Sequence, residues 1–169
     1  DRRTMYVRRI HIQHMKRIAD LTLDFEHDGQ PRMWTVLIGE NGTAKTTILQ
    51  AIALAAAGSR QVNTLGRPIV KHLRDRRSDA QMQVVTEFAF TPQSLRDPAV
   101  HPHAHGTEGL GLWSRLWLDN GSTSIGAQAA YLRDGARHFS SEDVLDDARA
   151  AHTHLWFVAG YGVSRNLPD

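Results

Sequence analysis

Nine consecutive residues have the types and spacing of a loop that binds phosphate groups. They are Gly39, Glu40, Asn41, Gly42, Thr43, Ala44, Lys45, Thr46 and Thr47. In the pattern G-x-x-x-x-G-K-[ST], placed between a strand and a helix, successive backbone N–H groups curl around phosphates. The positive end of the following helix adds to the attraction. A glycine-rich turn that merely joins a strand to a helix is the plainer alternative, and the match at both ends of the pattern disfavours it.

The side chains of the loop predict specific roles. Lys45 would reach the β- and γ-phosphates, Thr46 would place its hydroxyl on Mg²⁺, and Thr47 could touch the α-phosphate. The expected cofactors are therefore a nucleoside triphosphate, most simply ATP, and Mg²⁺. The loop contacts only the phosphates, so its sequence does not specify which nucleotide base is preferred.

One position departs from the pattern, because Ala44 stands where glycine normally precedes the lysine. Glycine lets the backbone approach the phosphates with no Cβ in the way. We therefore expect Ala44 to weaken nucleotide binding. The alternative is a tolerated small residue with near-normal binding.

Elements on both sides must position this loop. The apolar run Trp34–Ile38 predicts a central strand before it, and the helical period of Thr46–Ala57 predicts a helix after it, ending near Gly58. Alternation predicts two earlier strands, Tyr6–Gln13 and Leu21–Phe25.

Antiparallel strands are expected to follow. The predicted elements are strands at Gln83–Phe90 and Leu112–Leu118, tight hairpins at Asn120-Gly121 and Asp134-Gly135, a helix over residues 140–151 and a closing strand over 155–160. The expected fold is α/β, a P-loop domain with an antiparallel β-rich portion. Residues 1–169 would form one partial domain, with a P-loop core at 5–58 and a β-rich insertion and meander at 60–155.

Composition narrows the class of protein. The 169 residues are 41% hydrophobic and 22% charged, which is ordinary for a soluble globular domain. Cysteine is absent, and no apolar run reaches the roughly 20 residues of a membrane span, so we expect a cytoplasmic protein without a membrane partner. A net charge of +2 does not by itself argue for nucleic acid, and the basic clusters at 8–9 and 74–77 are interpreted as solvated surface.

Beyond the P-loop pattern, the first third of the chain resembles a known family. Ile10-His11-Ile12-Gln13, Val36–Thr43 and Ile48–Ala53 resemble the opening of ATPase heads of the SMC/RecF/RecN group, which belong with the ABC-type ATPases. Residues 160–165, Gly-Tyr-Gly-Val-Ser-Arg, resemble a segment in bacterial AAA-type ATPases of this branch, several of them in anti-phage defence systems.

The resemblance implies a function and partners. Heads of this family sandwich ATP between two copies, so it implies a homodimer through ATP, DNA as a partner, and an effector protein as a further partner. The full-length protein would hydrolyse ATP to act on DNA in repair or phage defence. The rival hypothesis is a regulatory or scaffolding module whose P-loop has degenerated at Ala44.

The family's catalytic parts are not found. The apolar run ending at Asp119 is followed by Asn120 where the family has glutamate, and no Ser-Gly-Gly signature is present. We therefore expect this chain to be the N-terminal lobe of a head, without the C-terminal half. It should bind nucleotide and not hydrolyse it alone.

Three other groups of residues carry weaker signals. His101, His103 and His105 alternate and could ligate a metal, although a solvated loop is the default interpretation. The tryptophans at 113, 117 and 156 are interpreted as core or interface aromatics, with base stacking as the alternative. Lys16 and Arg17 are interpreted as plain surface residues, and the alternative is a contact with nucleotide or DNA, because the resemblance places them where the family's heads approach these ligands.

Overall fold

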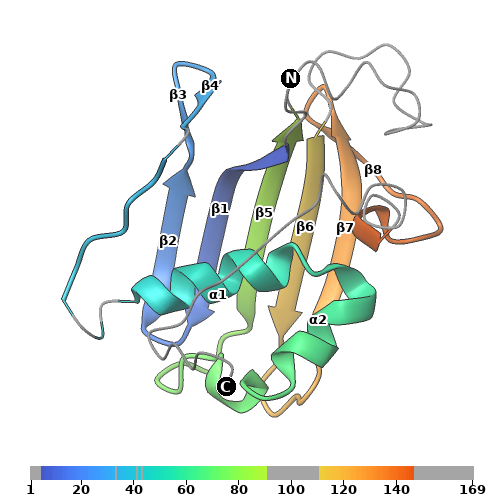
Figure 1. The fold of residues 1–169 in the computed structure, drawn as a ribbon. Coiled ribbons are helices and arrows are strands. Elements are labelled where there is room, and N and C mark those ends of the chain that lie inside the picture. The colour runs from blue at the N-terminus through green and yellow to red at the C-terminus, as the bar shows by residue number, and fades with distance from the viewer. Residues whose placement is uncertain (1–4, 33, 41, 43, 91–110, 147–169) are drawn as a thin grey trace, which may run out of the picture.

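The architecture is an antiparallel sheet with helices on one face (Figure 1). A computed structural model describes residues 5–32, 34–40, 42, 44–90 and 111–146. The six-stranded sheet has the order β2-β1-β5-β6-β7-β8, and each neighbouring pair is antiparallel. Its strands are β1 (Met5–Met15), β2 (Ile18–Asp24), β5 (Met82–Phe90), β6 (Gly111–Leu118), β7 (Gly126–Arg133) and β8 (Ala136–His138).

Alternation along the strands gives the sheet one buried face. Ile10 and Ile12 of β1 are fully buried, whereas Arg9, which directly precedes Ile10, is exposed. On β6, Leu112 and Leu116 face the same core. The predicted strands Tyr6–Gln13, Leu21–Phe25, Gln83–Phe90 and Leu112–Leu118 are confirmed, with end points that differ by a few residues.

Two helices cover the buried face (Figure 1). Helix α1 (Lys45–Ala55) crosses β1, β5 and β6, and α2 (Gly58–Gly66) lies against β7. The Ser114 hydroxyl on β6 donates a 3.0 Å hydrogen bond to the carbonyl oxygen of Ala55, which fixes the end of α1 to the sheet. The predicted helix and its end near Gly58 are confirmed, since Gly58 has a φ of +72°.

The predicted central strand Trp34–Ile38 is wrong in this structure. Residues 34–38 have no regular secondary structure, and Trp34, Val36 and Ile38 are 89%, 77% and 92% exposed. A strand persists only when a neighbour satisfies its backbone N–H and C=O groups, and no described strand pairs with this segment. The fold is nevertheless α/β, as predicted, and its sheet is mostly antiparallel.

The two predicted hairpins differ in outcome. At Asp134-Gly135 both residues have positive φ, +50° and +75°, and a tight turn joins β7 to β8 as predicted. The prediction at Asn120-Gly121 is confirmed in part: the N–H of Ser122 donates a 3.1 Å hydrogen bond to the carbonyl oxygen of Asp119 across a tight turn, and Gly121 has a φ of +76°. The whole connection from β6 to β7 is longer than a two-residue turn, because it runs over residues 119–125. Ile125, at the end of this connection, is buried in the core.

Short elements complete the described chain. The strands β3 (Glu26–His27) and β4 (Gln30–Pro31) form a small hairpin, and the 3₁₀ helix η1 (Val70–His72) follows α2. Residues 144–146 are helical, which agrees with the start of the helix predicted over 140–151. The rest of that helix and the closing strand at 155–160 lie outside the described residues. Among the described residues, no helix has the length and apolar character of a membrane span.

Candidate phosphate-binding site

Lys45 lies at the centre of the candidate site. It is the first residue of α1, and its Nζ donates hydrogen bonds to the carbonyl oxygens of Gly39 and Glu40, at 2.5 and 2.6 Å. The side chain therefore folds back over the loop that precedes its helix. An ammonium group held by backbone carbonyls inside a loop can exchange those neutral acceptors for phosphate oxygens, which bind it more strongly.

The start of α1 has no side-chain cap. The first N–H groups of any helix lack intrahelical partners, and Ala44 at the N-cap position has no side chain that could accept from them. The first turn of α1 also carries no acidic residue. Because nothing in the helix neutralises its positive end, this end is suited to an anion.

The backbone at Ala44 is left-handed, with φ +60° and ψ 0°. An L-residue with a Cβ pays about 1–2 kcal/mol in this conformation, whereas glycine adopts it freely. From the sequence alone, the methyl group of Ala44 is expected to crowd the phosphates. The structure adds a conformational cost that exists without any ligand. The glycine normally found here is explained by the same φ.

Arg17 is brought to the loop by the turn between β1 and β2. A Cβ placed at Gly42 would lie 3.8 Å from Nη1 of Arg17, so the guanidinium borders the loop. Next to it, Lys16 donates a 2.6 Å hydrogen bond to Oε1 of Gln50 on α1. The turn is thus tied to the helix that follows the loop. The sequence favours a plain surface role for Lys16 and Arg17 and does not predict this tie, because no local pattern marks Gln50.

The two threonines of the motif lie in different environments. Thr46 is exposed in the first turn of α1, where its hydroxyl is accessible to a metal ion. Thr47 is buried, like the next residue of α1, Ile48. The Mg²⁺ role of Thr46 and the α-phosphate role of Thr47 remain predictions. Gly39, Glu40 and Gly42 are exposed, and Asn41 and Thr43 lie outside the described residues.

The structure describes only some of the remaining sequence candidates, and those have contacts elsewhere. Asp119 accepts a 2.7 Å hydrogen bond from Nε2 of Gln81, and among the described residues no cluster could hold a metal ion. His101, His103, His105 and Trp156 lie outside the described residues. Trp117 lies under the guanidinium of Arg115, whose carbon is 5.5 Å from the ring centre. Trp113 is buried and stacks edge-on against Phe139, consistent with a packing role.

The basic cluster at Arg8-Arg9 is neutralised by neighbouring carboxylates. Arg8 pairs with Glu26 at 3.2 Å and Arg9 with Asp24 at 2.6 Å. Tyr6 also donates to Glu26, and burial together with this carboxylate raises the pKa of Tyr6 to about 12. The cluster is therefore paired surface charge, as interpreted from the sequence.

Comparison with known proteins identifies the family of the chain. A family model described as an AAA domain matches residues 9–100, which is more than half of the chain. The chain is also similar to Septu protein PtuA of Bacillus mycoides (strain KBAB4), with 39% identity over 57 residues. That similarity covers 33% of this chain and 8% of the length of the relative.

Proposed function

The chain belongs to the AAA domain family, and from this premise we propose that residues 39–47 bind the phosphates of ATP together with Mg²⁺. The observation that carries the proposal is the position of Lys45, whose ammonium lies against the carbonyls of Gly39 and Glu40. This places a single positive charge inside a loop at the positive end of a helix.

In this proposal, each of several described groups has a separate role in binding the phosphates. The N-terminal N–H groups of α1 donate to phosphate oxygens, and Lys45 turns from the loop carbonyls toward the same oxygens. Arg17 adds a second cation at the edge of the loop beside Gly42. When bound, Mg²⁺ supplies neutralisation of the phosphate charge, and Thr46 is the residue that would hold it.

The wider activity is a further part of the proposal, supported by the resemblance to SMC/RecF/RecN-type heads. In that proposal the full-length protein hydrolyses ATP, its heads dimerise through ATP, and DNA and an effector protein are partners. Phage defence is the process favoured, because residues 160–165 resemble a segment of ATPases from such systems. The second candidate is a nucleotide-binding regulatory module, and the strained backbone at Ala44 is the observation that favours it.

Calorimetric titration of ATP, with and without Mg²⁺, tests the site. Replacing Lys45 with alanine removes a charged hydrogen-bond donor to phosphate, so we expect affinity to fall by about tenfold or more. Arg9→Ala is the matched control, because Arg9 is paired with Asp24 on a different strand and should leave the affinity unchanged. Equal affinities for the original chain and Lys45→Ala would overturn the proposal. A GTP titration alongside measures base preference.

A further inference from the structure

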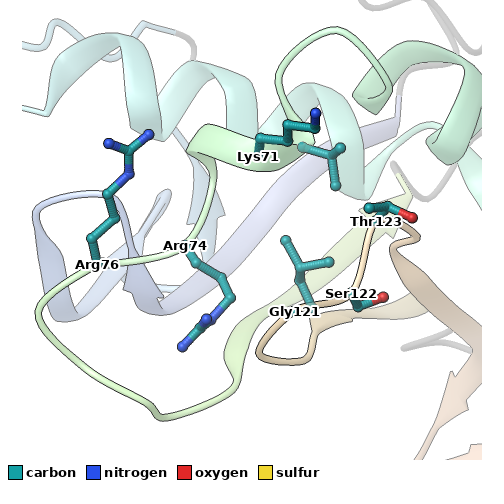
Figure 2. Close-up of a pocket in the computed structure, with 8 residues that line it drawn as sticks. Lys71, Arg74, Arg76, Gly121, Ser122 and Thr123 are labelled. Carbon is teal, nitrogen blue, oxygen red and sulfur yellow. The ribbon is translucent and has the colours of Figure 1, made fainter.

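An open pocket of about 240 Å³ lies at the end of the sheet where η1 and its following loop meet the connection from β6 to β7 (Figure 2). Three of its side chains are cations, two carry hydroxyls, and one residue is a glycine. The lining consists of Val70, Lys71, Arg74, Arg76, Leu118, Gly121, Ser122 and Thr123. None of these residues belongs to the P-loop.

Within the described part of the chain, the two arginines of the pocket have neutral hydrogen-bond partners. Arg74 donates to the side-chain oxygen of Asn120 and to the carbonyl oxygens of Ser78 and Ala80, the last two at 2.7 and 3.3 Å. A nitrogen of the Arg76 guanidinium lies 2.7 Å from Nδ1 of His72. Among the described residues, no carboxylate forms an ion pair with Lys71, Arg74 or Arg76.

Three other arginines of the chain do pair with carboxylates. Arg77 follows Arg76 directly in sequence, yet it pairs with Asp75 at 2.8 Å. Arg8 and Arg9 on β1 pair with Glu26 and Asp24. Ion pairs thus offset the charge of Arg8, Arg9 and Arg77, whereas no described carboxylate offsets the charge of the three cations that line the pocket. Their combined field attracts an anion into the pocket.

The pocket is also shaped in advance. The two carbonyl acceptors on the loop fix the guanidinium of Arg74, and its Nε is buried without a hydrogen-bond partner among the described residues. Buried Val70 and Leu118 form apolar parts of the wall. Gly121 has a φ of +76°, and a Cβ placed there would have no atom within 4 Å, so the backbone of this turn is open to a ligand. The hydroxyl of exposed Thr123 provides a further donor.

We propose that this pocket binds a phosphate group, at a second anion site separate from residues 39–47. Several cationic donors with hydroxyls around an open cavity are suited to a group that carries several charged oxygens. The phosphate could belong to a free oligophosphate or to the backbone of a nucleic acid, which share this chemistry. The proposal does not rest on nucleotide binding by the P-loop.

The test uses two doubly substituted chains with the same change of charge. Lys71→Gln with Arg76→Gln removes two exposed cations from the pocket. Arg8→Gln with Arg9→Gln removes two paired cations from β1 and serves as the control. Both are made in a Lys45→Ala background, so that the P-loop does not contribute to the signal. Circular dichroism verifies that each variant is folded.

Two probes distinguish the source of the phosphate. Inorganic pyrophosphate is titrated by calorimetry, and a fluorescent 20-nucleotide oligothymidylate is titrated by anisotropy over a range of salt concentrations. We expect the pocket variant to bind at least one probe about tenfold more weakly than its parent, with the control unchanged. For the oligonucleotide, losing two phosphate contacts should reduce the salt slope by about 2.

Each outcome decides the proposal. Weakened pyrophosphate binding shows that the phosphate group alone is sufficient, and weakened oligonucleotide binding without it assigns the site to a phosphodiester backbone. If the pocket variant binds both probes like its parent, the proposal is wrong. It is equally wrong if the control loses as much affinity as the pocket variant, because the effect would then reflect net charge.

Discussion

At the scale of single residues, Ala44 is the position where the chain departs most from its motif. Its φ of +60° costs about 1–2 kcal/mol for an L-residue, a cost that glycine avoids. Glycine also makes the unfolded chain more flexible, which lowers stability by about 0.4–1 kcal/mol and offsets part of this gain. Ala44→Gly should therefore raise the free energy of unfolding by about 0.5–1 kcal/mol. It should also tighten ATP binding, since the methyl group beside the phosphates is removed.

The control for this prediction makes the same chemical change within α1. Ala53 lies inside the helix, so Ala53→Gly should cost about 1 kcal/mol, with the opposite sign. Urea unfolding of both variants measures the two effects. A destabilising effect at Ala44 as large as that at Ala53 would contradict the prediction and would mean that the methyl contact of Ala44 with the core dominates.

Asp75 gives the chain a stability that depends on pH. Hydrogen bonds from the side chain and backbone of Arg77 lower the pKa of Asp75 from 3.8 to about 2. A carboxyl whose pKa is lower in the folded state stabilises the fold above the unfolded value, and the contribution is lost as pH falls. We expect this loss between pH 4 and pH 2.

Asp75→Asn tests that window. The substitution should lower the urea midpoint at pH 7, and the difference from the original chain should shrink as the pH falls through the same window. Asp134→Asn is the control, because Asp134 is an exposed turn residue with φ +50°, a conformation that asparagine also adopts. A difference that stays constant from pH 7 to pH 2 would rule out the ionic contribution.

At the scale of elements, α2 depends on residues far away in the chain. The helix has no N-terminal cap of its own. Instead, Asp143 accepts from the backbone N–H of Ser59, and Asp146 accepts from the Ser59 hydroxyl and the N–H of Arg60, at 3.0 to 3.2 Å. A side chain at Gly58 would place its Cβ 2.5 Å from Oδ1 of Asp146, so the close approach requires glycine.

Removal of this distant cap should destabilise α2. Asp146 is buried, and Asp146→Ala leaves two donors without their acceptor, so the free energy of unfolding should fall by about 1–3 kcal/mol. Glu142→Ala is the control, because Glu142 is an exposed neighbour and should change stability by about 0.5 kcal/mol or less. Chemical denaturation compares them, and equal effects would contradict the capping role.

The same elements explain which parts of the fold were predictable. The strands of the sheet and α1 carry their own period, so alternation and a helical repeat predict them. Helix α2 was not predicted, because Gly58-Ser-Arg-Gln-Val-Asn-Thr-Leu-Gly66 contains weak helix formers and is stabilised from Asp143 and Asp146. The strand at Trp34–Ile38 was predicted wrongly, because an apolar run specifies burial only where a partner strand exists.

The candidate site was predictable in part for a related reason. The motif gives the loop and Lys45 directly, because their spacing along the chain is itself the signal. The approach of Arg17 to Gly42 arises from a turn about 25 residues earlier in sequence, and the cationic pocket joins η1 to the connection after β6. Contacts of this kind depend on the register of the whole sheet and are absent from any local pattern.

At the scale of the whole molecule, the described fold leaves three apolar side chains of one segment uncovered, although Leu37 in the same segment packs against the core. Trp34, Val36 and Ile38 are almost fully exposed in the segment that leads into the P-loop. Exposed side chains contribute little to folding, because they remove no surface from water. These side chains do favour association between molecules, because burial of a contiguous apolar segment against another surface lowers the free energy.

A triple substitution of Trp34, Val36 and Ile38 to serine should therefore separate association from stability. We expect weaker concentration-dependent association in sedimentation velocity and a thermal midpoint unchanged within about 2 °C. Leu49→Ser with Leu65→Ser is the control, because these exposed leucines lie on α1 and α2, away from the segment. A loss of several kcal/mol in the triple variant would show that the segment is covered in the folded molecule, as the central strand predicted from the sequence would be. An unchanged midpoint would instead confirm that the antiparallel sheet and its two helices are stable without it.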